Sequence, residues 1–210
     1  MPRPLFIVFE GIDGCGKSTQ LSLLCERLAA MGRSPLPTAE PTDSTTGKLL
    51  RAALAGTDPR TAAEMAALFT LDRIHHNQCE NGIEKWLASG FDVISDRYYY
   101  SSLAYQGSLT DYEWVRRMNC DCPEIRRPDL CIFLDMPPKA ALSRIGHRGT
   151  STEIYEKEDT LTLVRATFLR VFETLSDNVA IINADGTPEE VAARVWDAVK
   201  TLLPGEQERM

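Results

Sequence analysis

The sequence predicts an α/β fold in three layers, with a five-stranded parallel sheet covered by helices on both faces. Short apolar runs alternate along the chain with longer stretches of helical periodicity, as expected when strands are buried on both sides. The 210 residues suit one domain of this kind, and no linker rich in proline, glycine or serine divides them. We therefore expect a single domain over residues 1–210.

Four apolar runs are the clearest candidates for strands. They are Leu5–Phe9, Asp92–Ser95, Leu130–Leu134 and Val179–Ile182. A weaker run over Ser34–Thr38 completes the five strands. Each run is followed by a longer stretch of helical character, which is the order of elements in a parallel sheet with helical crossovers.

Helical spacing predicts a helix directly behind the first strand, and Gly32 offers its end. Further helices are predicted over Thr46–Leu54, Thr61–Ala88, Tyr112–Met118, Pro138–Ile145, Thr160–Leu175 and Pro188–Leu202. The last of them opens on a capping box, with Thr187 as N-cap, Pro188 at the first helical position and Glu190 three residues after the cap.

A glycine-rich loop joins the first strand to the first helix. It reads Gly11-Ile12-Asp13-Gly14-Cys15-Gly16-Lys17-Ser18 and matches the phosphate-binding pattern of P-loop NTPases. The glycines let backbone N–H groups turn inward around phosphates, Lys17 reaches the β- and γ-phosphates, and the Ser18 hydroxyl can ligate Mg²⁺. We expect these residues and the following Thr19 to bind ATP. A glycine-rich turn without a ligand is the alternative.

Charge and hydropathy narrow the classes of partner. The net charge is −7, whereas binding to a phosphate backbone needs clustered lysine and arginine, so we expect no nucleic-acid partner. The sequence shows no charged-then-apolar leader and no apolar run near the roughly 18 residues of a membrane span. We therefore expect a cytoplasmic protein that does not contact membranes.

Cysteines and histidines show no pattern typical of a metal site. The six cysteines lack zinc-ribbon spacing and are expected to be free thiols. Cys15 lies in a loop that favours anions, which predicts an accessible thiolate at this position. His75 and His76 are expected on a helix surface.

Polar residues follow the predicted strands at the edge where open parallel sheets bind ligands. Either Asp96 or Asp135 could orient the Mg²⁺ shell opposite Ser18, and spacing does not choose between them. Arg97 has a planar fork suited to phosphate oxygens, so we expect it to hold an acceptor phosphate in line with the γ-phosphate. A salt bridge near a helix start is the alternative for Arg97.

Several further motifs extend beyond the phosphate loop. They are Phe9-Glu10-Gly11-Ile12-Asp13, Glu40-Pro41-Thr42, Leu68-Phe69 with Arg73, Asp96-Arg97-Tyr98, Tyr105-Gln106, Pro128-Asp129-Leu130, Leu134-Asp135 and Asn183-Ala184-Asp185-Gly186-Thr187. In this order they resemble the thymidylate kinase family from the loop to the last helix. The resemblance implies an enzyme that makes dTDP from dTMP and Mg·ATP, lays the last motif against adenine, and forms a homodimer.

The resemblance also implies a role for each residue around the base of dTMP. Phe69 would stack on thymine, because an aromatic face suits a flat base, and Arg73 would donate to thymine O4. Ser102 and Gln106 would lie near the remaining polar edge of the base, and Ser101 is expected among the substrate-binding residues. Ordinary core packing is the alternative for Phe69.

Roles around the sugar and phosphate follow from the same resemblance. Asp13 would accept a hydrogen bond from the sugar 3′-hydroxyl, and Tyr105 would close the space that a ribose 2′-hydroxyl needs, unless it is a core residue. Arg97 would hold the dTMP phosphate. Asp96 rather than Asp135 would orient the Mg²⁺ shell.

Two positions depart from the family pattern. Ala39 replaces an arginine that many members carry before the Glu-Pro pair, which keeps open a kinase of the same fold that acts on another nucleoside monophosphate. Gly14 occupies the place of an arginine that reaches the γ-phosphate in some members. In members that lack this arginine, the lid supplies the positive charge.

A small lid is therefore expected over residues 144–156, with Arg144 or Arg148 neutralising the transferred phosphoryl group. A monophosphate-binding insertion is expected near residues 38–75.

Two rival classes remain beside a kinase. The guanine signature Asn-Lys-x-Asp is absent from the sequence, which disfavours a GTP-dependent switch. A nucleotide-binding module without activity is disfavoured because Lys17, Ser18, Asp96 and Arg97 are all intact.

Overall fold

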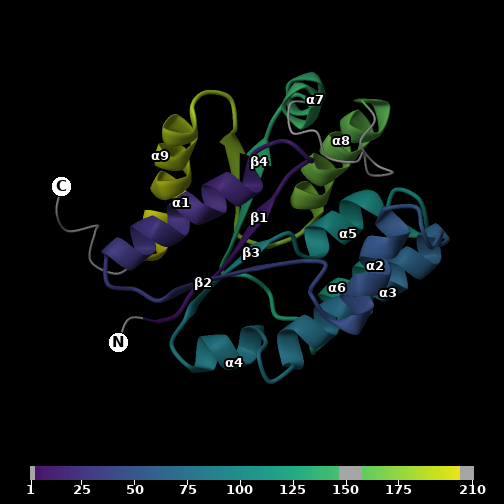
Figure 1. Ribbon diagram of the computed structural model, residues 1–210, viewed down its shortest axis with the longest axis horizontal. Helices are drawn as coiled ribbons and strands as arrows, with labels where there is room; N and C mark the ends of the chain where they lie inside the picture. Colours follow the sequence, from purple (N-terminus) through teal and green to yellow (C-terminus); the bar gives the residue numbers. More distant parts are fainter. Residues whose placement is uncertain (1–2, 147–157, 204–210) are drawn as a thin grey trace.

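A parallel five-stranded sheet lies at the centre of the protein (Figure 1). The computed structural model describes residues 3–146 and 158–203. The strands follow the order β2-β3-β1-β4-β5, and every neighbouring pair is parallel. Their bounds are Phe6–Glu10 (β1), Pro35–Ala39 (β2), Asp92–Asp96 (β3), Leu130–Asp135 (β4) and Val179–Asn183 (β5). The predicted sheet is confirmed.

Each strand runs one residue further at its carboxyl end than the apolar pattern predicts. In β1, β3 and β4 the additional residue is acidic, namely Glu10, Asp96 and Asp135. Backbone pairing continues through these positions, since Glu10 is in register with Phe133 and Asp96 with Ala39. The sheet therefore carries acidic residues at its carboxyl edge, where open parallel sheets bind ligands.

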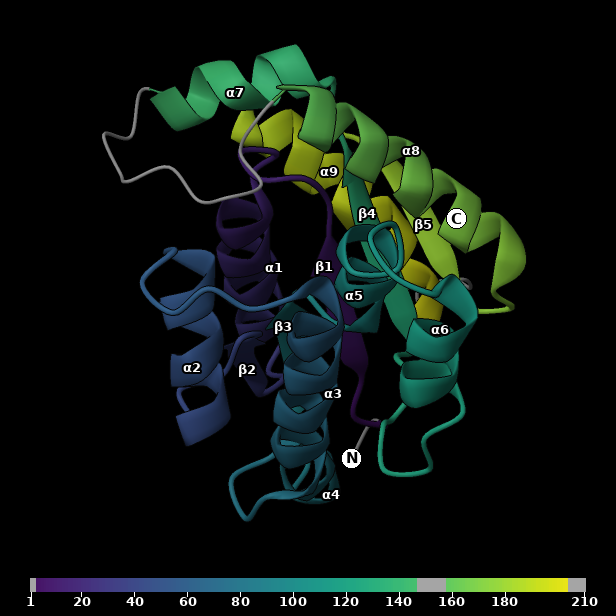
Figure 2. The ribbon, with the colours of Figure 1, turned by 90° about the vertical axis from the view of Figure 1, so that its right-hand side faces the viewer.

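Helices cover both faces of the sheet (Figures 1 and 2). Their bounds are Lys17–Ala30 (α1), Thr45–Leu54 (α2), Ala62–Gln78 (α3), Ile83–Ala88 (α4), Tyr99–Tyr105 (α5), Tyr112–Cys120 (α6), Pro138–Gly146 (α7), Glu158–Thr174 (α8) and Pro188–Val199 (α9), with a 3₁₀ turn over Lys200–Leu202. Helix α1 packs beside α9, α5 packs on α8, and α2 packs on α3, which contacts α5 and α6. Across the described ranges, none of the helices has the length and apolarity needed to cross a bilayer.

The local signals for helix ends are confirmed. The Thr187 hydroxyl accepts from the Glu190 N–H at 3.3 Å, and the Glu190 carboxylate accepts from the Thr187 N–H at 2.8 Å, which completes the capping box of α9. Helix α1 ends at Ala30, and Gly32 follows with a φ of 77°. Only glycine adopts this conformation without strain.

Two helix predictions need correction. The stretch Thr61–Ala88 forms two helices, α3 and α4, because the chain turns sharply at Gly82. A Cβ atom there would lie 2.6 Å from the His76 carbonyl oxygen, so the turn requires glycine. Residues 99–105, where no helix was predicted, form α5. Their tyrosines favour strands on propensity, and burial in the core overrides that preference.

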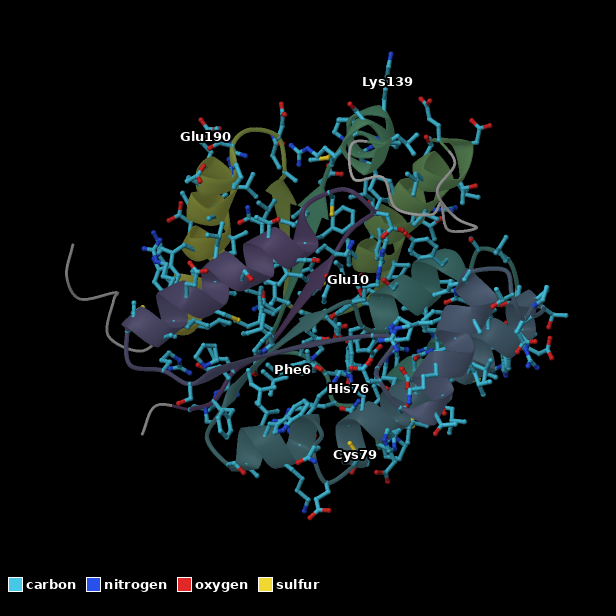
Figure 3. The ribbon with its side chains drawn as sticks, viewed as in Figure 1. Phe6, Glu10, His76, Cys79, Lys139 and Glu190 are labelled. Atoms are coloured by element: carbon cyan, nitrogen blue, oxygen red, sulfur yellow. The ribbon has the colours of Figure 1, made fainter. Side chains whose placement is uncertain are left out.

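The apolar face of α8 packs on the sheet. The Phe168 and Phe172 rings lie 5.1 and 5.0 Å from the ring of Phe133 in β4. Phe168 is fully buried, which contributes about 1.5–3 kcal/mol before the entropic cost of ordering the side chain, whereas Phe172 is half-buried. Among the labelled side chains of Figure 3, Phe6 lies in this interior and Lys139 projects from the surface.

Candidate active site

The phosphate loop adopts the backbone that its glycines allow. Gly11, Gly14 and Gly16 have φ values of 143°, 82° and 102°. A Cβ atom on Gly11 would lie 2.8 Å from the Leu134 carbonyl oxygen, so the loop needs glycine for space as well as for φ. The Lys17 ammonium folds back over the loop and donates to the carbonyls of Gly11 at 3.1 Å and Ile12 at 3.3 Å.

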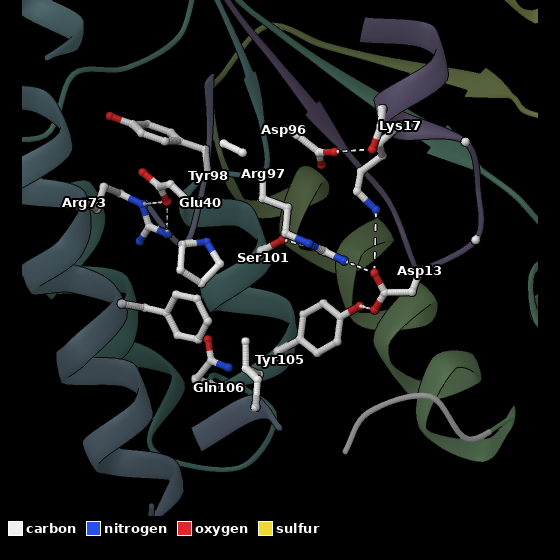
Figure 4. Close-up of a pocket in the computed structure, with 17 residues that line it drawn as sticks. Asp13, Lys17, Glu40, Arg73, Asp96, Arg97, Tyr98, Ser101, Tyr105 and Gln106 are labelled. Atoms are coloured by element: carbon white, nitrogen blue, oxygen red, sulfur yellow. Dashed lines mark hydrogen bonds and ion pairs between the residues drawn. The ribbon is translucent and has the colours of Figure 1, made fainter. Parts of the chain in front are cut away.

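A cavity of about 280 Å³ opens beside this loop, and Figure 4 shows the side chains that line it. It brings together the ends of β2 and β3, the loop, α3 and α5. The predicted site residues that line it are Asp13, Gly14, Gly16, Lys17, Ser18, Phe69, Arg73, Asp96, Arg97, Ser101, Tyr105 and Gln106. Ser102 lies behind the wall, where its hydroxyl accepts from Arg73 at 3.2 Å.

Arg97 projects across this cavity toward the phosphate loop (Figure 4). Its φ of 71° makes it the one non-glycine residue in the left-handed region within the described parts of the chain. The guanidinium donates to the Ser101 hydroxyl at 2.9 Å and pairs with the Asp13 carboxylate. Burial opposes its charge, but Asp13 and neighbouring acidic groups outweigh burial and raise the pKa of Arg97 well above its ordinary value.

Asp13 is the counter-ion of two cations. Besides Arg97 it faces the Lys17 ammonium at 3.9 Å, and the Tyr105 hydroxyl donates to it at 3.5 Å. Burial would raise the pKa of Asp13, but the charges of Arg97 and Lys17 outweigh burial and lower it. The site therefore holds an ionised carboxylate between the cationic side chains of Arg97 and Lys17.

The two aspartates that the sequence left as alternatives have different surroundings. The Ser18 hydroxyl donates to Asp96 at 3.0 Å, so both oxygens lie together in the cavity. Asp135 instead makes a bidentate ion pair with Arg165 of α8, at 2.6 and 2.8 Å. Oxygen donors of this kind suit Mg²⁺, and the geometry favours Asp96 as the carboxylate near the phosphates.

The end of the cavity away from Asp13 is built on Arg73, which is 1% exposed (Figure 4). Its guanidinium pairs with Glu40 at 2.7 and 2.9 Å and also donates to Asn119. Arg73 was predicted as a site residue but Asn119 was not; Asn119 lies on α6, 46 residues further along the chain. No local pattern connects two residues at such a separation.

The surface position expected for His76 is wrong. Its ring is 3% exposed, with Nδ1 3.0 Å from Glu40 and Nε2 2.8 Å from the Thr38 hydroxyl. His75 is exposed, as expected. Helix α3 packs a polar face against the end of β2. From the sequence alone, a polar helix face predicts exposure to solvent, so the burial of His76 was not predicted.

The accessible thiolate expected at Cys15 is also wrong. Its side chain is 2% exposed, and burial raises the pKa of the thiol. The sulfur points inward beneath the loop, toward Gly11. The six cysteines are free, as predicted.

A second hollow lies on the other side of the phosphate loop. Gly16, Thr19, Arg144, Ala184 and Gly186 are among its lining residues, so it joins the loop to α7 and to the segment after β5. The other candidate arginine of the lid, at position 148, lies outside the described residues.

The fold and this site define a P-loop kinase with room for an acceptor next to the triphosphate site. The sequence profile of the thymidylate kinase family matches residues 9–195. The chain belongs to the thymidylate kinase family, and it catalyses the ATP-dependent phosphorylation of dTMP to dTDP.

Individual relatives agree with this assignment. A probable thymidylate kinase of Pyrococcus horikoshii is 40% identical, with 97% of this chain and 99% of that protein aligned. A thymidylate kinase of a Synechococcus strain is 36% identical over 95% of this chain and 96% of its own length. The solved thymidylate kinase of Candida albicans shares the fold with a TM-score of 0.80 at 24% identity, covering 96% of this chain and 93% of that one.

Proposed function

We propose that the phosphate loop holds ATP and that Arg97 holds the phosphate of dTMP, so that the acceptor oxygen faces the γ-phosphate across the cavity. The observation that supports this most strongly is the shared counter-ion, because Lys17 and Arg97 both face Asp13. Because both cations face the same carboxylate, they lie close together. This arrangement suits the binding of two phosphates side by side for in-line transfer.

The transfer needs little covalent chemistry from the protein. Lys17 and Arg97 would stabilise charge that develops on the transferred and acceptor phosphates. Residues 144–156 would close over the cavity and exclude water, and Arg144 or Arg148 would add positive charge. The position of Arg144 beside the phosphate loop supports its part in this role.

Mg²⁺ would be held near Ser18 and Asp96, whose oxygens fit its preference for hard ligands. When bound, Mg²⁺ neutralises charge on the β- and γ-phosphates. The residues themselves would orient the ion: the Ser18 hydroxyl as a ligand and the Asp96 carboxylate as the acceptor that fixes the surrounding shell.

Asp96→Asn tests this assignment, with Asp135→Asn as its matched control. We expect Asp96→Asn to raise the Mg²⁺ concentration for half-maximal activity about tenfold to a hundredfold, because loss of a carboxylate that orients the ligands of a metal weakens metal binding by this factor. Asp135→Asn should leave the Mg²⁺ requirement unchanged and lower the melting temperature, since it breaks the pair with Arg165. Equal Mg²⁺ requirements in the two variants would remove Asp96 from the metal site.

At the other end of the cavity, thymine would stack on Phe69 and receive a hydrogen bond from Arg73, within the insertion proposed at residues 38–75. Ser101, Ser102 and Gln106 would complete the polar surroundings of the nucleotide, and Asp13 would accept from the 3′-hydroxyl. Support comes from the cavity, which Phe69 lines and in which Arg73 and Gln106 lie at one end and Asp13 at the other (Figure 4).

Tyr105 would select deoxyribose by filling the space beside the sugar. Tyr105→Ala should raise the kcat/KM of the ribonucleotide relative to that of dTMP, because removal of the ring opens room for a 2′-hydroxyl. Tyr105→Phe keeps the ring and loses the bond to Asp13, so the ratio should stay at the wild-type value. If Tyr105→Ala also keeps the wild-type ratio, the ring is a packing residue.

We also propose a homodimer in the cytoplasm. Leu49 of α2 is 41% exposed and Leu71 of α3 is 53% exposed, so two adjoining helices offer apolar side chains to a second copy. The free cysteines agree with a reducing compartment.

A further inference from the structure

Glu10 is a fully buried carboxylate that no part of the proposed mechanism uses. It ends β1, directly before the phosphate loop, and is 0% exposed. Figure 3 shows its side chain inside the molecule. Burial of an acidic group is costly unless hydrogen bonds or opposite charges compensate, so its contacts explain why it is tolerated.

Both oxygens of Glu10 bind the first turn of α5. Oε1 accepts from the Tyr98 N–H at 2.8 Å and the Ser101 N–H at 3.1 Å, and Oε2 accepts from the Ser101 hydroxyl at 2.7 Å. The N-cap residue Tyr98 offers no side-chain acceptor of its own. Glu10 therefore caps α5 from another element, and its negative charge suits a helix N-terminus.

The same contacts lead to Arg97. The Ser101 hydroxyl donates to Glu10 and accepts from the Arg97 guanidinium at 2.9 Å, so one hydroxyl connects the carboxylate to the arginine. Arg97 itself sits in a left-handed backbone conformation with a φ of 71°. A bulky residue adopts that conformation only where its neighbours fix it, and Tyr98, bound by Glu10, is the next residue.

We propose that Glu10 is a positioning residue for the reaction: its carboxylate fixes the turn at Arg97 and, through Ser101, aims the guanidinium at the acceptor phosphate. This inference rests on the proposed role of Arg97 toward dTMP. It assigns Glu10 no contact with either substrate.

Glu10 titrates near neutral pH, which offers a readout that packing alone does not give. Burial raises its pKa to about 7, against the opposing effects of Arg97, the hydrogen bonds of Ser101 and Tyr98, and Lys17. The other titratable groups that it influences are Tyr105 of α5 and Cys131 of β4. Above pH 7 Glu10 is a carboxylate that accepts from Ser101, and below pH 7 it is a neutral acid.

Glu10→Gln mimics the neutral acid in shape and charge. We expect the ratio of kcat/KM for dTMP, wild type over Glu10→Gln, to be about tenfold at pH 8, the value of one charge-assisted hydrogen bond, and to approach one at pH 6. Ionisation of the dTMP phosphate affects both enzymes equally and cancels in the ratio. The KM for ATP should change less than about twofold, since Glu10 acts on the acceptor side.

Asp92→Asn is the matched control. Asp92 is also a buried carboxylate, 1% exposed, which accepts from the Leu5 N–H and pairs with Arg33 at the opposite end of the sheet. The ratio of kcat/KM for dTMP, wild type over Asp92→Asn, should be one at every pH, although the melting temperature of the variant falls. A ratio for Glu10→Gln that does not change with pH, or that equals one throughout, would overturn the proposal.

Ser101→Ala provides a second route if Glu10→Gln folds poorly. Because Ser101 connects Glu10 to Arg97, the ratio of kcat/KM for dTMP, wild type over Ser101→Ala, should also fall from pH 8 toward pH 6. The double variant Glu10→Gln/Ser101→Ala should lose less kcat/KM than the product of the two separate losses. Effects that simply multiply would refute the connection. If Arg97→Ala leaves the kcat/KM for dTMP unchanged, the proposed role of Arg97 fails by itself. If Arg97→Ala lowers kcat/KM but the Glu10→Gln ratio does not change with pH, only the role of Glu10 is refuted.

Discussion

Replacing Lys17 by methionine is expected to lower kcat by about a thousandfold. The ammonium lies over the phosphate loop and has no acidic partner closer than Asp13, at 3.9 Å, among the described residues. Methionine keeps the length of the side chain and removes its charge. Charge that develops on the transferred phosphoryl group then loses a fixed cation, and the loss of one such group typically lowers the rate by a factor of 10²–10³.

The loss should appear in kcat rather than in folding. Lys17 makes hydrogen bonds to two loop carbonyls, whereas its removal leaves Asp13 paired with Arg97. We expect a melting temperature close to that of the wild type. Lys85→Met on α4, an exposed lysine, serves as the control for loss of one positive charge. A Lys17→Met enzyme with more than about a tenth of the wild-type kcat would remove Lys17 from the catalytic residues.

Sequence alone predicted those parts of the site that lie within one contiguous motif. The phosphate loop needs only neighbouring residues, because its glycines set the backbone and Lys17 begins the helix that follows. Arg97 was found for a similar reason: it follows a buried strand directly, and the carboxyl ends of parallel strands converge on one edge.

Contacts between distant segments could not be predicted in this way. Glu10 reads as the polar end of an apolar run, and its partners Tyr98 and Ser101 lie 88 and 91 residues away. Helix α5 was not predicted for the same reason. The group that accepts hydrogen bonds from its N-terminal N–H groups is Glu10 of β1, which lies far from the helix in the sequence. His76 looked like a surface residue because its partner Glu40 lies on another element, 36 residues earlier.

Replacing Arg97 by alanine is expected to lower kcat/KM for dTMP by about a hundredfold to a thousandfold. The guanidinium lines the cavity, where we propose that it holds the phosphate of dTMP, and its planar fork can bind two phosphate oxygens at once. Arg97→Lys restores the charge but not the fork, so it should recover only part of the loss. The KM for ATP should change little in either variant, because we propose that ATP binds through the phosphate loop.

A third variant separates this effect from backbone strain. Arg97→Gly also removes the guanidinium, but glycine accepts the φ of 71° without the roughly 1–2 kcal/mol that other residues incur there. Its greater entropy in the unfolded chain offsets about 0.5–1 kcal/mol of that gain, so Arg97→Gly should be at least as stable as Arg97→Ala. If the side chain binds phosphate, both variants must lose the same activity despite their different stabilities. Should Arg97→Gly retain activity that Arg97→Ala loses, the turn rather than the guanidinium would carry the effect, and the acceptor phosphate would need another cation.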